Sequence, residues 1–323
     1  MRLRVQAVAW CTALWCGPYA MAQLANADPG VAIVPRLRPA PAIGDAEPLL
    51  RIDSSLVQIP VHVTNAMGKT VDGLKTDNFR ILEDRVEQTI STFSMDDAPV
   101  SIGFLFDTSG SMKTKMKKSA EAAAAFFRTA NPEDEFFLIE FNDRARLIEP
   151  FTTDSNALYE QIVHTRPAGR TTLIDALYLA IGQMRNARHM RKAIVILSDG
   201  GDNWSRRSGR ELKGTLLEAD VQVYAMGIFD QEMRTAEERN GPALLDEITE
   251  ETGGRHYPVA DLDQLPDISE RIGRELRNQY LLGYHPSNLA RDGKYRQVVV
   301  KLATPDAHDL RTYYRRGYYA PAD

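Results

Sequence analysis

Four near-continuous apolar runs, separated by longer segments with helical spacing, constrain the fold of this chain more than any other feature. The runs occupy residues 101–107, 135–141, 192–199 and 221–229. Strands have this composition when helices cover both faces of a parallel sheet, because neither face then meets water. The alternation of such strands with helices predicts a doubly wound, mostly parallel α/β domain, which we place at residues 97–278.

The segments between the runs carry apolar residues at the three- and four-residue spacing of a buried helix face. The helix expected after the first run buries Met116, Ala120, Ala123, Ala124 and Phe127. The helix expected before the third run buries Leu173, Ala176, Leu177, Ala180, Ile181 and Met184. Two further helices are expected, one over residues 244–254, where glycines suit the helix C-terminus, and one around residues 265–276.

Strand-like segments flank this domain on both sides. Residues 57–63 alternate between apolar and other residues, with Pro60 at a position that suits an edge or a bulge. Short apolar strands and a turn follow residue 280. We therefore expect β modules at residues 52–96 and 279–323, either separate or joined in one shared β-sandwich into which the α/β domain is inserted.

The N-terminus has the three parts of a secretory signal peptide. A basic start, an apolar run and the small-x-small sequence Ala20-Met21-Ala22 predict cleavage after residue 22. Residues 23–51 are rich in proline and predict an extended linker. Both cysteines lie inside residues 1–22, so the mature protein forms no disulfide. We expect an exported protein, periplasmic or secreted, without a transmembrane segment in the mature chain.

The charge balance argues against nucleic acid as the main partner. The chain has 39 basic and 44 acidic residues, and cleavage after Ala22 would remove two of the basic ones. Nucleic acids and anionic lipids attract proteins through basic surfaces. A chain with an excess of acids is poorly suited to either.

Acid and hydroxyl side chains follow three elements of the predicted domain. Asp107, Ser109 and Ser111 alternate directly after the first apolar run, Thr171 opens a helix, and Asp199 ends the third run. Ligands of open α/β sheets bind at the carboxyl ends of the strands, where these side chains should meet. All five are oxygen donors, which a hard divalent cation such as Mg²⁺ takes in near-octahedral geometry. The alternative is that they serve only as turn and helix-cap residues.

The same five residues resemble the site of a known family. The pattern Asp-x-Ser-x-Ser, then Thr, then Asp is similar to the metal-ion-dependent adhesion site (MIDAS) of the von Willebrand factor A (VWA) domain, and the resemblance covers residues 98–270. The flanks resemble the exported VWFA-related Acidobacterial domain family, although Arg85 and Arg170 stand where many members have glycine. The resemblance implies a Rossmann-like VWA fold in which Mg²⁺ or Mn²⁺ captures an aspartate or glutamate of a partner protein. It implies a binding module and not an enzyme.

Two other functions fit part of the pattern. A haloacid-dehalogenase-like phosphatase also has a strand-end aspartate and an acidic Mg²⁺ loop, which residues 199–202 resemble. That chemistry needs a second carboxylate two residues after the nucleophile as general acid, and Ser109 stands there. The other alternative is a structural scaffold in an envelope assembly, with the metal used for stability.

Basic and aromatic side chains surround the expected site. The lysines of residues 113–118 either steer an acidic partner or form a solvated helix face, and the second interpretation is simpler. The arginines of residues 206–210 have the same two interpretations. Trp204 is either a partner anchor or a packing residue.

Overall fold

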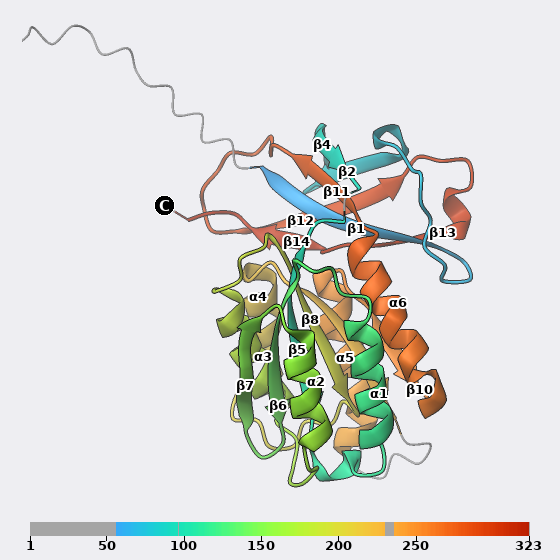
Figure 1. Ribbon diagram of the computed structural model, residues 1–323. Helices are drawn as coiled ribbons and strands as arrows, with labels where there is room; N and C mark the ends of the chain where they lie inside the picture. The colour runs from blue at the N-terminus through green and yellow to red at the C-terminus, as the bar shows by residue number, and fades with distance from the viewer. Residues whose placement is uncertain (1–55, 96, 230–235, 323) are drawn as a thin grey trace, which may run out of the picture. The chain divides into compact units, whose positions relative to one another are not determined.

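A computed structural model describes residues 56–95, 97–229 and 236–322 of the 323-residue chain (Figure 1). The described residues belong to one compact unit, which spans Asp53–Asp323. The signal peptide and the proline-rich linker predicted for residues 1–51 lie outside the described residues. Within the described part, no helix has the length and apolar character needed to cross a membrane.

The centre of this compact unit is a six-stranded sheet with the strand order β10-β9-β8-β5-β6-β7. Its parallel strands are β5 (Val100–Asp107), β6 (Glu135–Phe141), β8 (Arg191–Ser198), β9 (Gln222–Ile228) and β10 (His256–Val259). The edge strand β7 (Ala145–Thr152) runs antiparallel to β6. Every residue of β5, β6 and β9 is buried, as expected of strands covered on both faces.

Helices cover both faces of this sheet (Figure 1). One face packs against α1 (Met116–Phe127), α2 (Ser155–His164) and α6 (Leu265–Arg277), and the other against α3 (Leu173–Met184), α4 (Gly209–Glu218) and α5 (Ala236–Thr252). Successive residues of β5 point to opposite faces, so Phe104 joins the first core and Leu105 the second. The predicted doubly wound, mostly parallel α/β fold is confirmed, although β7, α2 and α4 were not among the predicted elements.

The buried face of α1 differs from the predicted one. Met116, Ala120 and Ala124 were expected inside but are only partly buried, whereas Ala122 and Phe126 are fully buried. Five of the twelve residues of this helix are alanines, so apolar spacing alone does not define which side meets the sheet. The small side chains also let α1 pack against α2 and α6 on its flanks.

Two smaller sheets contain strands from both flanks of the α/β domain, in the orders β13-β1-β11-β4 and β14-β12-β2-β3. The N-terminal flank supplies β1 (Val57–Asn65), β2 (Phe79–Glu83), β3 (Val86–Gln88) and β4 (Ile90–Ser94). The C-terminal flank supplies β11 (Tyr280–Tyr284), β12 (Tyr295–Leu302), β13 (Leu310–Tyr313) and β14 (Gly317–Tyr319). Ile59, Phe79, Leu282 and Val300 of these strands share one apolar core, so the two sheets form a β-sandwich.

The α/β domain leaves and re-enters the sandwich through adjacent strands. β4 ends at Ser94, shortly before the domain begins, and β11 begins at Tyr280, directly after α6. β4 and β11 pair in antiparallel register, with Ser94 opposite Leu281. The two connections to the inserted domain therefore lie side by side.

Two local features of the sandwich follow from single residues. Pro60 of β1 pairs with β11 on one side, while β13 pairs only with the later residues His62 to Asn65. The proline therefore lies in the half of the strand whose second edge is open, where its missing N–H costs no ladder bond. Between β2 and β3, Asp84 and Arg85 both have positive φ, the pattern of a type I′ turn that favours glycine.

Four single-turn 3₁₀ helices complete the described elements: Thr76–Asn78, Gly110–Met112, Leu262–Gln264 and Ala307–Asp309.

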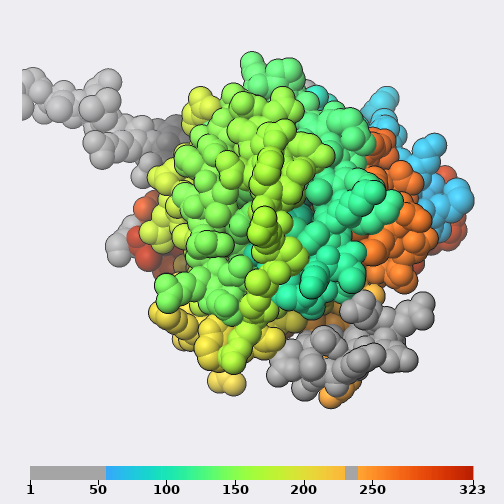
Figure 2. Space-filling model, turned by 60° about the horizontal axis from the view of Figure 1, so that its bottom comes forward, coloured from blue at the N-terminus to red at the C-terminus, as the bar shows by residue number. Residues whose placement is uncertain are grey.

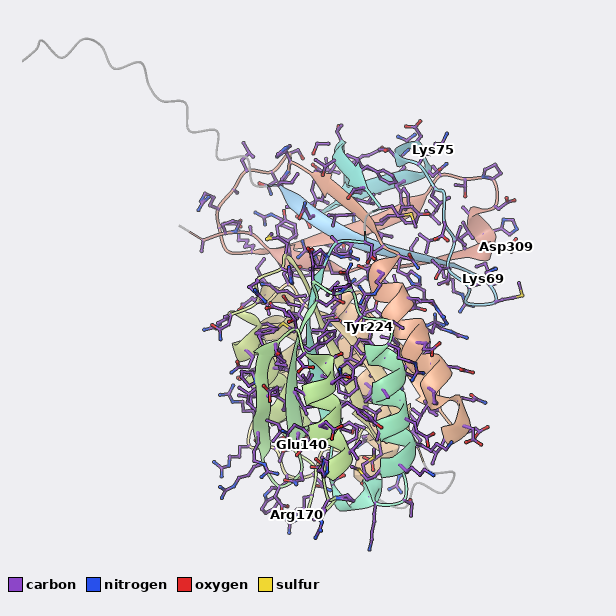
Figure 3. All side chains as sticks on the ribbon, viewed as in Figure 1. Lys69, Lys75, Glu140, Arg170, Tyr224 and Asp309 are labelled. Carbon is purple, nitrogen blue, oxygen red and sulfur yellow. The ribbon has the colours of Figure 1, made fainter. Side chains whose placement is uncertain are left out.

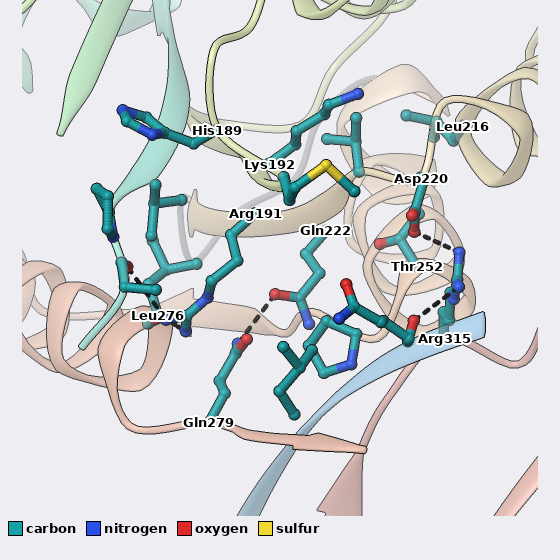
Figure 4. Close-up of a pocket in the computed structure, with 18 of the residues that line it drawn as sticks. His189, Arg191, Lys192, Leu216, Asp220, Gln222, Thr252, Leu276, Gln279 and Arg315 are labelled. Atoms are coloured by element: carbon teal, nitrogen blue, oxygen red, sulfur yellow. Dashed lines mark hydrogen bonds and ion pairs between the residues drawn. The ribbon is translucent and has the colours of Figure 1, made fainter. Parts of the chain in front are cut away.

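A cavity of about 440 Å³ lies between the sandwich and the N-terminal ends of β5, β8 and β9 (Figure 4). Several of the polar groups that line it bond to one another. Gln279 Nε2 donates to Gln222 Oε1 at 2.9 Å, and Arg315 forms an ion pair with Asp220 while Nη2 donates to the Gln58 carbonyl at 2.8 Å. This junction lies at the opposite end of the sheet from the carboxyl ends of the parallel strands.

Candidate metal centre

Asp107 is the last residue of β5, and both oxygens of its carboxylate already accept hydrogen bonds. Oδ1 accepts the backbone N–H of Ser109 at 2.8 Å, and Oδ2 accepts the hydroxyl of Ser198 at 2.5 Å. Ser198 ends β8, which pairs directly with β5. The two neighbouring strands therefore hold this buried carboxylate from two sides.

Ser109 and Ser111 lie in the tight turn after β5. The 3₁₀ helix Gly110–Met112 brings the two hydroxyl oxygens to 3.0 Å from each other, with Ser109 buried and Ser111 exposed. Gly110 donates its N–H to the carbonyl of Gly169 at 3.0 Å. A Cβ at Gly110 would lie 3.3 Å from that oxygen, so the glycine permits the close approach of the two loops.

Thr171 lies in the loop between α2 and α3, and the loop after β8 holds its backbone. Its N–H donates to Asn203 Oδ1 at 3.1 Å, and its carbonyl accepts the N–H groups of Asn203 and Trp204 at 3.2 and 3.1 Å. The residue is 4% exposed. Its hydroxyl forms no hydrogen bond with any residue that the structure describes, so this oxygen remains available to a ligand.

Asp199 directly follows β8 and is 7% exposed. Its Oδ1 accepts the N–H of Gly201 at 3.4 Å. Burial, and then the negative charge of Asp199, raise the pKa of Asp107 to about 7. Within the described ranges, no ion pair joins either carboxylate to a lysine or arginine. The two acids therefore form a buried pair of like charges.

The three loops meet at the carboxyl ends of the parallel strands. Figure 2 turns this end of the domain toward the viewer, and the yellow-green segment before α3 crosses it beside the teal segment after β5. The N–H of Ala168 donates to the Thr108 carbonyl at 2.8 Å, which joins the same two segments. Arg170, next to Thr171, marks this end in Figure 3, while Lys75 and Asp309 mark the sandwich at the other.

The available donors fit a hard divalent cation. Two carboxylates and three hydroxyls offer five oxygens, and an octahedral Mg²⁺ takes six. In the part of the chain that the structure describes, no three His, Cys, Asp or Glu side chains gather where they would hold a metal ion. A site here depends on the hydroxyl oxygens, which suits Mg²⁺ or Mn²⁺ better than a softer metal.

Sequence reasoning did not find the residues that support the five candidates. Asp202 Oδ2 accepts the N–H of Ile174 at 2.8 Å and the hydroxyl of Ser205 at 2.6 Å, and so caps the start of α3 from another loop. Ser198 and Asn203 hold Asp107 and Thr171 as described above. All three residues lie in the Ser-Asp-Gly-Gly-Asp-Asn segment, next to the candidate ligand Asp199, and this was the only indication of their role in the sequence. Which groups they bond to depends on how the loops cross in three dimensions.

The basic side chains around the site differ in their burial and in their interaction partners. Lys115 is buried and donates Nζ to the Ile228 carbonyl at 3.1 Å, so neither interpretation offered for these lysines describes it. Lys118 pairs with Glu121 and Asp263. Arg170, in contrast, is exposed and stacks on Trp204, with its guanidinium carbon 3.6 Å from the ring centroid.

Comparison with known proteins matches the same region. Residues 102–201, which contain all five candidate ligands, match the family model of the von Willebrand factor type A domain. Inter-alpha-trypsin inhibitor heavy chain H2 of Sus scrofa is 29% identical over 155 residues, covering 42% of this chain and 16% of that protein. The Homo sapiens protein of that name is 25% identical over 171 residues, covering 46% and 18%.

The chain thus spans less than a fifth of the length of these relatives. Among solved structures, a von Willebrand factor type A protein from Catenulispora acidiphila is 13% identical, with a TM-score of 0.49 over 82% of this chain and 75% of that one. The segment matched by the family model begins in β5 and ends just after Asp199. Residues 102–201 of this chain therefore match the von Willebrand factor type A domain family.

Proposed function

We propose that the protein is a metal-dependent protein-binding module. Asp107, Ser109, Ser111, Thr171 and Asp199 hold Mg²⁺ or Mn²⁺, and an aspartate or glutamate of a partner protein completes the coordination. The observation that carries this proposal is the buried pair of carboxylates, Asp107 and Asp199, without a basic partner among the described residues. Like charges at close range in a buried site cost free energy, which a bound cation offsets.

The donor set supports a ligand from another molecule. Three of the five donors are neutral hydroxyls, so a bound ion would keep much of its attraction for a further anionic oxygen. Five donors also leave one position of an octahedron for that oxygen. Ser111 and Arg170 are exposed, so an acidic side chain of a partner can approach from solvent.

The same geometry favours binding over phosphoryl transfer. A phosphatase of the haloacid-dehalogenase type would use Asp107 as nucleophile and a carboxylate two residues later as general acid. Ser109 occupies that position, with its hydroxyl 3.0 Å from that of Ser111. Within the described ranges, no histidine forms a hydrogen bond with any of the five candidate ligands. We therefore propose that the protein is not an enzyme.

We further propose that the protein is exported, to the periplasm or beyond, after loss of residues 1–22. Its membership of the VWFA-related Acidobacterial family stays a prediction. A structural scaffold is the second candidate, because strands from both flanks build one sandwich within the same compact unit as the α/β domain. In that case the metal would mainly stabilise the fold.

A pull-down from the native envelope fraction tests the proposal. The purified protein is presented with MgCl₂ or with EDTA, and the retained proteins are compared with those retained by Thr171→Val. This variant removes a candidate ligand oxygen while keeping the side-chain shape. Thr153→Val, an exposed threonine before α2, is the matched control.

Capture that needs Mg²⁺, is lost in Thr171→Val and survives in Thr153→Val is the expected result. If EDTA lowers the melting temperature but no metal-dependent partner appears, the scaffold function replaces this one. Hydrolysis of a generic phosphoester that requires Mg²⁺ and Asp107 would instead support the phosphatase function.

A further inference from the structure

A hollow of about 720 Å³ lies beside the candidate metal centre. We use the name arginine groove for this hollow, for five residues that line it and for Arg170, which stacks on one of them; the five are Arg144, Tyr178, Trp204, Arg206 and Arg207. They come from the turn between β6 and β7, from the loop before α3, from α3 itself and from the loop after β8. Trp204 donates its backbone N–H to the Thr171 carbonyl, so the groove begins at a candidate metal ligand.

Two arginines of the groove are held by aromatic rings. The guanidinium carbon of Arg170 lies 3.6 Å from the centroid of Trp204, and that of Arg207 lies 4.4 Å from the centroid of Tyr178. Stacking uses the flat face of a guanidinium and leaves the N–H groups at its edge free to bind oxygen. Trp204 is itself 51% exposed, which is unusual for a side chain that serves only packing.

The acids of the groove are occupied by backbone groups. Asp143 accepts the N–H of Arg170 at 2.9 Å, and Asp175 accepts those of Arg206 and Arg207 at 3.1 and 3.2 Å. Across the residues described, no ion pair joins any of the four arginine side chains of the groove to a carboxylate. Arginines elsewhere do pair with acids, as Arg188 does with Glu135 and Arg277 with Asp134. The groove therefore has four arginines against two acids, and among the described residues no carboxylate forms an ion pair with these arginines.

We propose that the partner reaches the metal through an acidic peptide segment that carries at least two carboxylates. One carboxylate binds the metal, and a second lies in the arginine groove against the edges of Arg170 and Arg207. This inference rests on the proposed function. The adjacent positions of Arg170 and Thr171 let one short stretch of polypeptide reach both.

An acidic peptide fits this surface better than a nucleic acid. The whole chain has more acids than bases, which disfavours a long polyanion that must contact a wide basic surface. The groove offers a few stacked, forked donors close to the metal, and this geometry suits single carboxylates. The exposed ring of Trp204 next to Arg170 also provides contact area for the peptide backbone.

Selection from a random peptide library displayed on phage tests the proposal. The purified full chain is immobilised in MgCl₂, and bound phage are eluted with EDTA, so that only metal-dependent peptides are recovered. The enriched peptides are sequenced and synthesised, and their affinity is measured by fluorescence anisotropy at low and high salt. The expected peptides carry two or more acids, and their affinity falls as salt rises.

Single substitutions locate the second carboxylate. Arg170→Gln and, independently, Arg207→Gln are expected to weaken binding about tenfold, as the loss of a charge-assisted hydrogen bond does, and to reduce its dependence on salt. Arg185→Gln is the matched control, because Arg185 is also exposed but lies at the far end of α3. Thermal unfolding of each variant shows whether the fold is intact.

The outcomes separate this inference from the proposed function. If the metal-dependent peptides carry a single acid and bind equally to wild type and to both variants, the arginine groove takes no part in binding and this inference is overturned. The proposed metal site stands in that case. No metal-dependent peptide at all overturns the proposed function and this inference with it. Metal-independent binding of single-stranded DNA that both variants lose would assign the groove to a nucleic acid and also overturn the proposal.

Discussion

The two ends of the central sheet bury polar groups in opposite ways. At the sandwich end, opposite charges meet: Asp220 pairs with Arg315, and Glu275 accepts hydrogen bonds from Tyr257 and from Arg255. At the metal end, two buried carboxylates lie together, and the arginine groove beside them has no anionic partner among the described residues. The first arrangement is balanced within the chain. The second becomes balanced only when a cation and an anion arrive.

This difference separates a structural polar cluster from a binding site. Burial alone does not do so, because the cavity at the junction is also lined by buried polar groups, the amides of Gln222 and Gln279. What matters is whether each charge has a partner of opposite sign within the fold. Variants at the sandwich end should therefore change stability without changing metal affinity, and variants at the metal end should do the reverse.

The largest expected effect is on stability, from Glu275→Ala. The side chain is buried, accepts from the Tyr257 hydroxyl and from Arg255 Nη1 at 3.5 Å, and lies 3.7 Å from His62 Nδ1. Its removal leaves the Tyr257 hydroxyl and Arg255 Nη1 without this acceptor, and we expect a loss of about 3 kcal/mol in the free energy of unfolding. Urea denaturation measures it. Glu270→Ala on the more exposed side of α6 should cost much less, and a loss equal to that of Glu275→Ala would contradict the idea.

Asp107→Asn should produce the opposite pattern. We expect the affinity for Mg²⁺ to fall by about 100-fold or more, because a charged ligand is lost. Stability without metal should not fall, since the substitution removes one of two like charges and the amide can still bond to Ser109 and Ser198. Calorimetric titration with MgCl₂ and thermal unfolding in EDTA measure the two quantities. Unchanged Mg²⁺ affinity would remove Asp107 from the site.

A change of pH should act on the sandwich end through His62. Burial, and then the positive charge of Arg255, lower the pKa of His62 to about 4, whereas in the unfolded chain it lies near 6.5. Between these values the unfolded chain binds the extra proton, so stability is fully present above about pH 6.5 and is lost as the pH falls. The loss from about pH 7 to about pH 5 should be about 2 kcal/mol.

The His62 effect is measured by urea midpoints at the two pH values, in wild type and in His62→Gln. The difference between their pH dependences isolates this histidine from the carboxylates, which titrate in both proteins. Equal slopes would show that the ring is already protonated in the fold, paired with Glu275 at 3.7 Å.

The smallest effect is expected from Asp220→Asn. Asp220 has a φ of 52°, a conformation that asparagine adopts readily, so the backbone should not change. The variant loses the ion pair with Arg315, and because Asp220 is half exposed we expect a cost of only about 1 kcal/mol. Chemical denaturation with and without MgCl₂ measures it, and the cost should be equal in both. The substitution is the same as that at Asp107, but we expect it to leave the affinity for Mg²⁺ unchanged.

The fold was predictable where the pattern was unambiguous. β5, β6, β8 and β9 are buried on both faces, so they can be recognised in the sequence as apolar runs. β7 lies at an edge and is only partly buried, and Arg146, Glu149 and Pro150 interrupt its apolar residues. α2 and α4 are short and bury few residues each, which leaves little periodicity to detect. The buried face of α1 was predicted wrongly for a different reason, because its alanines are compatible with more than one buried face.

The candidate ligands could be named from order and spacing, whereas their supports could not. Asp107 ends β5 and Asp199 directly follows β8, and strand ends can be predicted from the sequence. Ser198 and Asn203 act through backbone and side-chain groups far away in sequence, so their roles appear only when the loops are placed. Arg170 stands where many related sequences have glycine, but spacing alone could not indicate its contact with Trp204.

The adjacency of β4 and β11 has a mechanical consequence. If a partner pulls on the α/β domain, the tension enters the sandwich through the end of β4 and the start of β11, which lie at the same end of an antiparallel pair. Both strands are then drawn the same way, and the force passes to the five residue pairs that join β11 to β1. Those bonds run across the strands, so a pull along β11 loads them in shear, all together. The α/β domain is thus attached to the sandwich so that the hydrogen bonds between β1 and β11 resist the force together and are not broken one at a time.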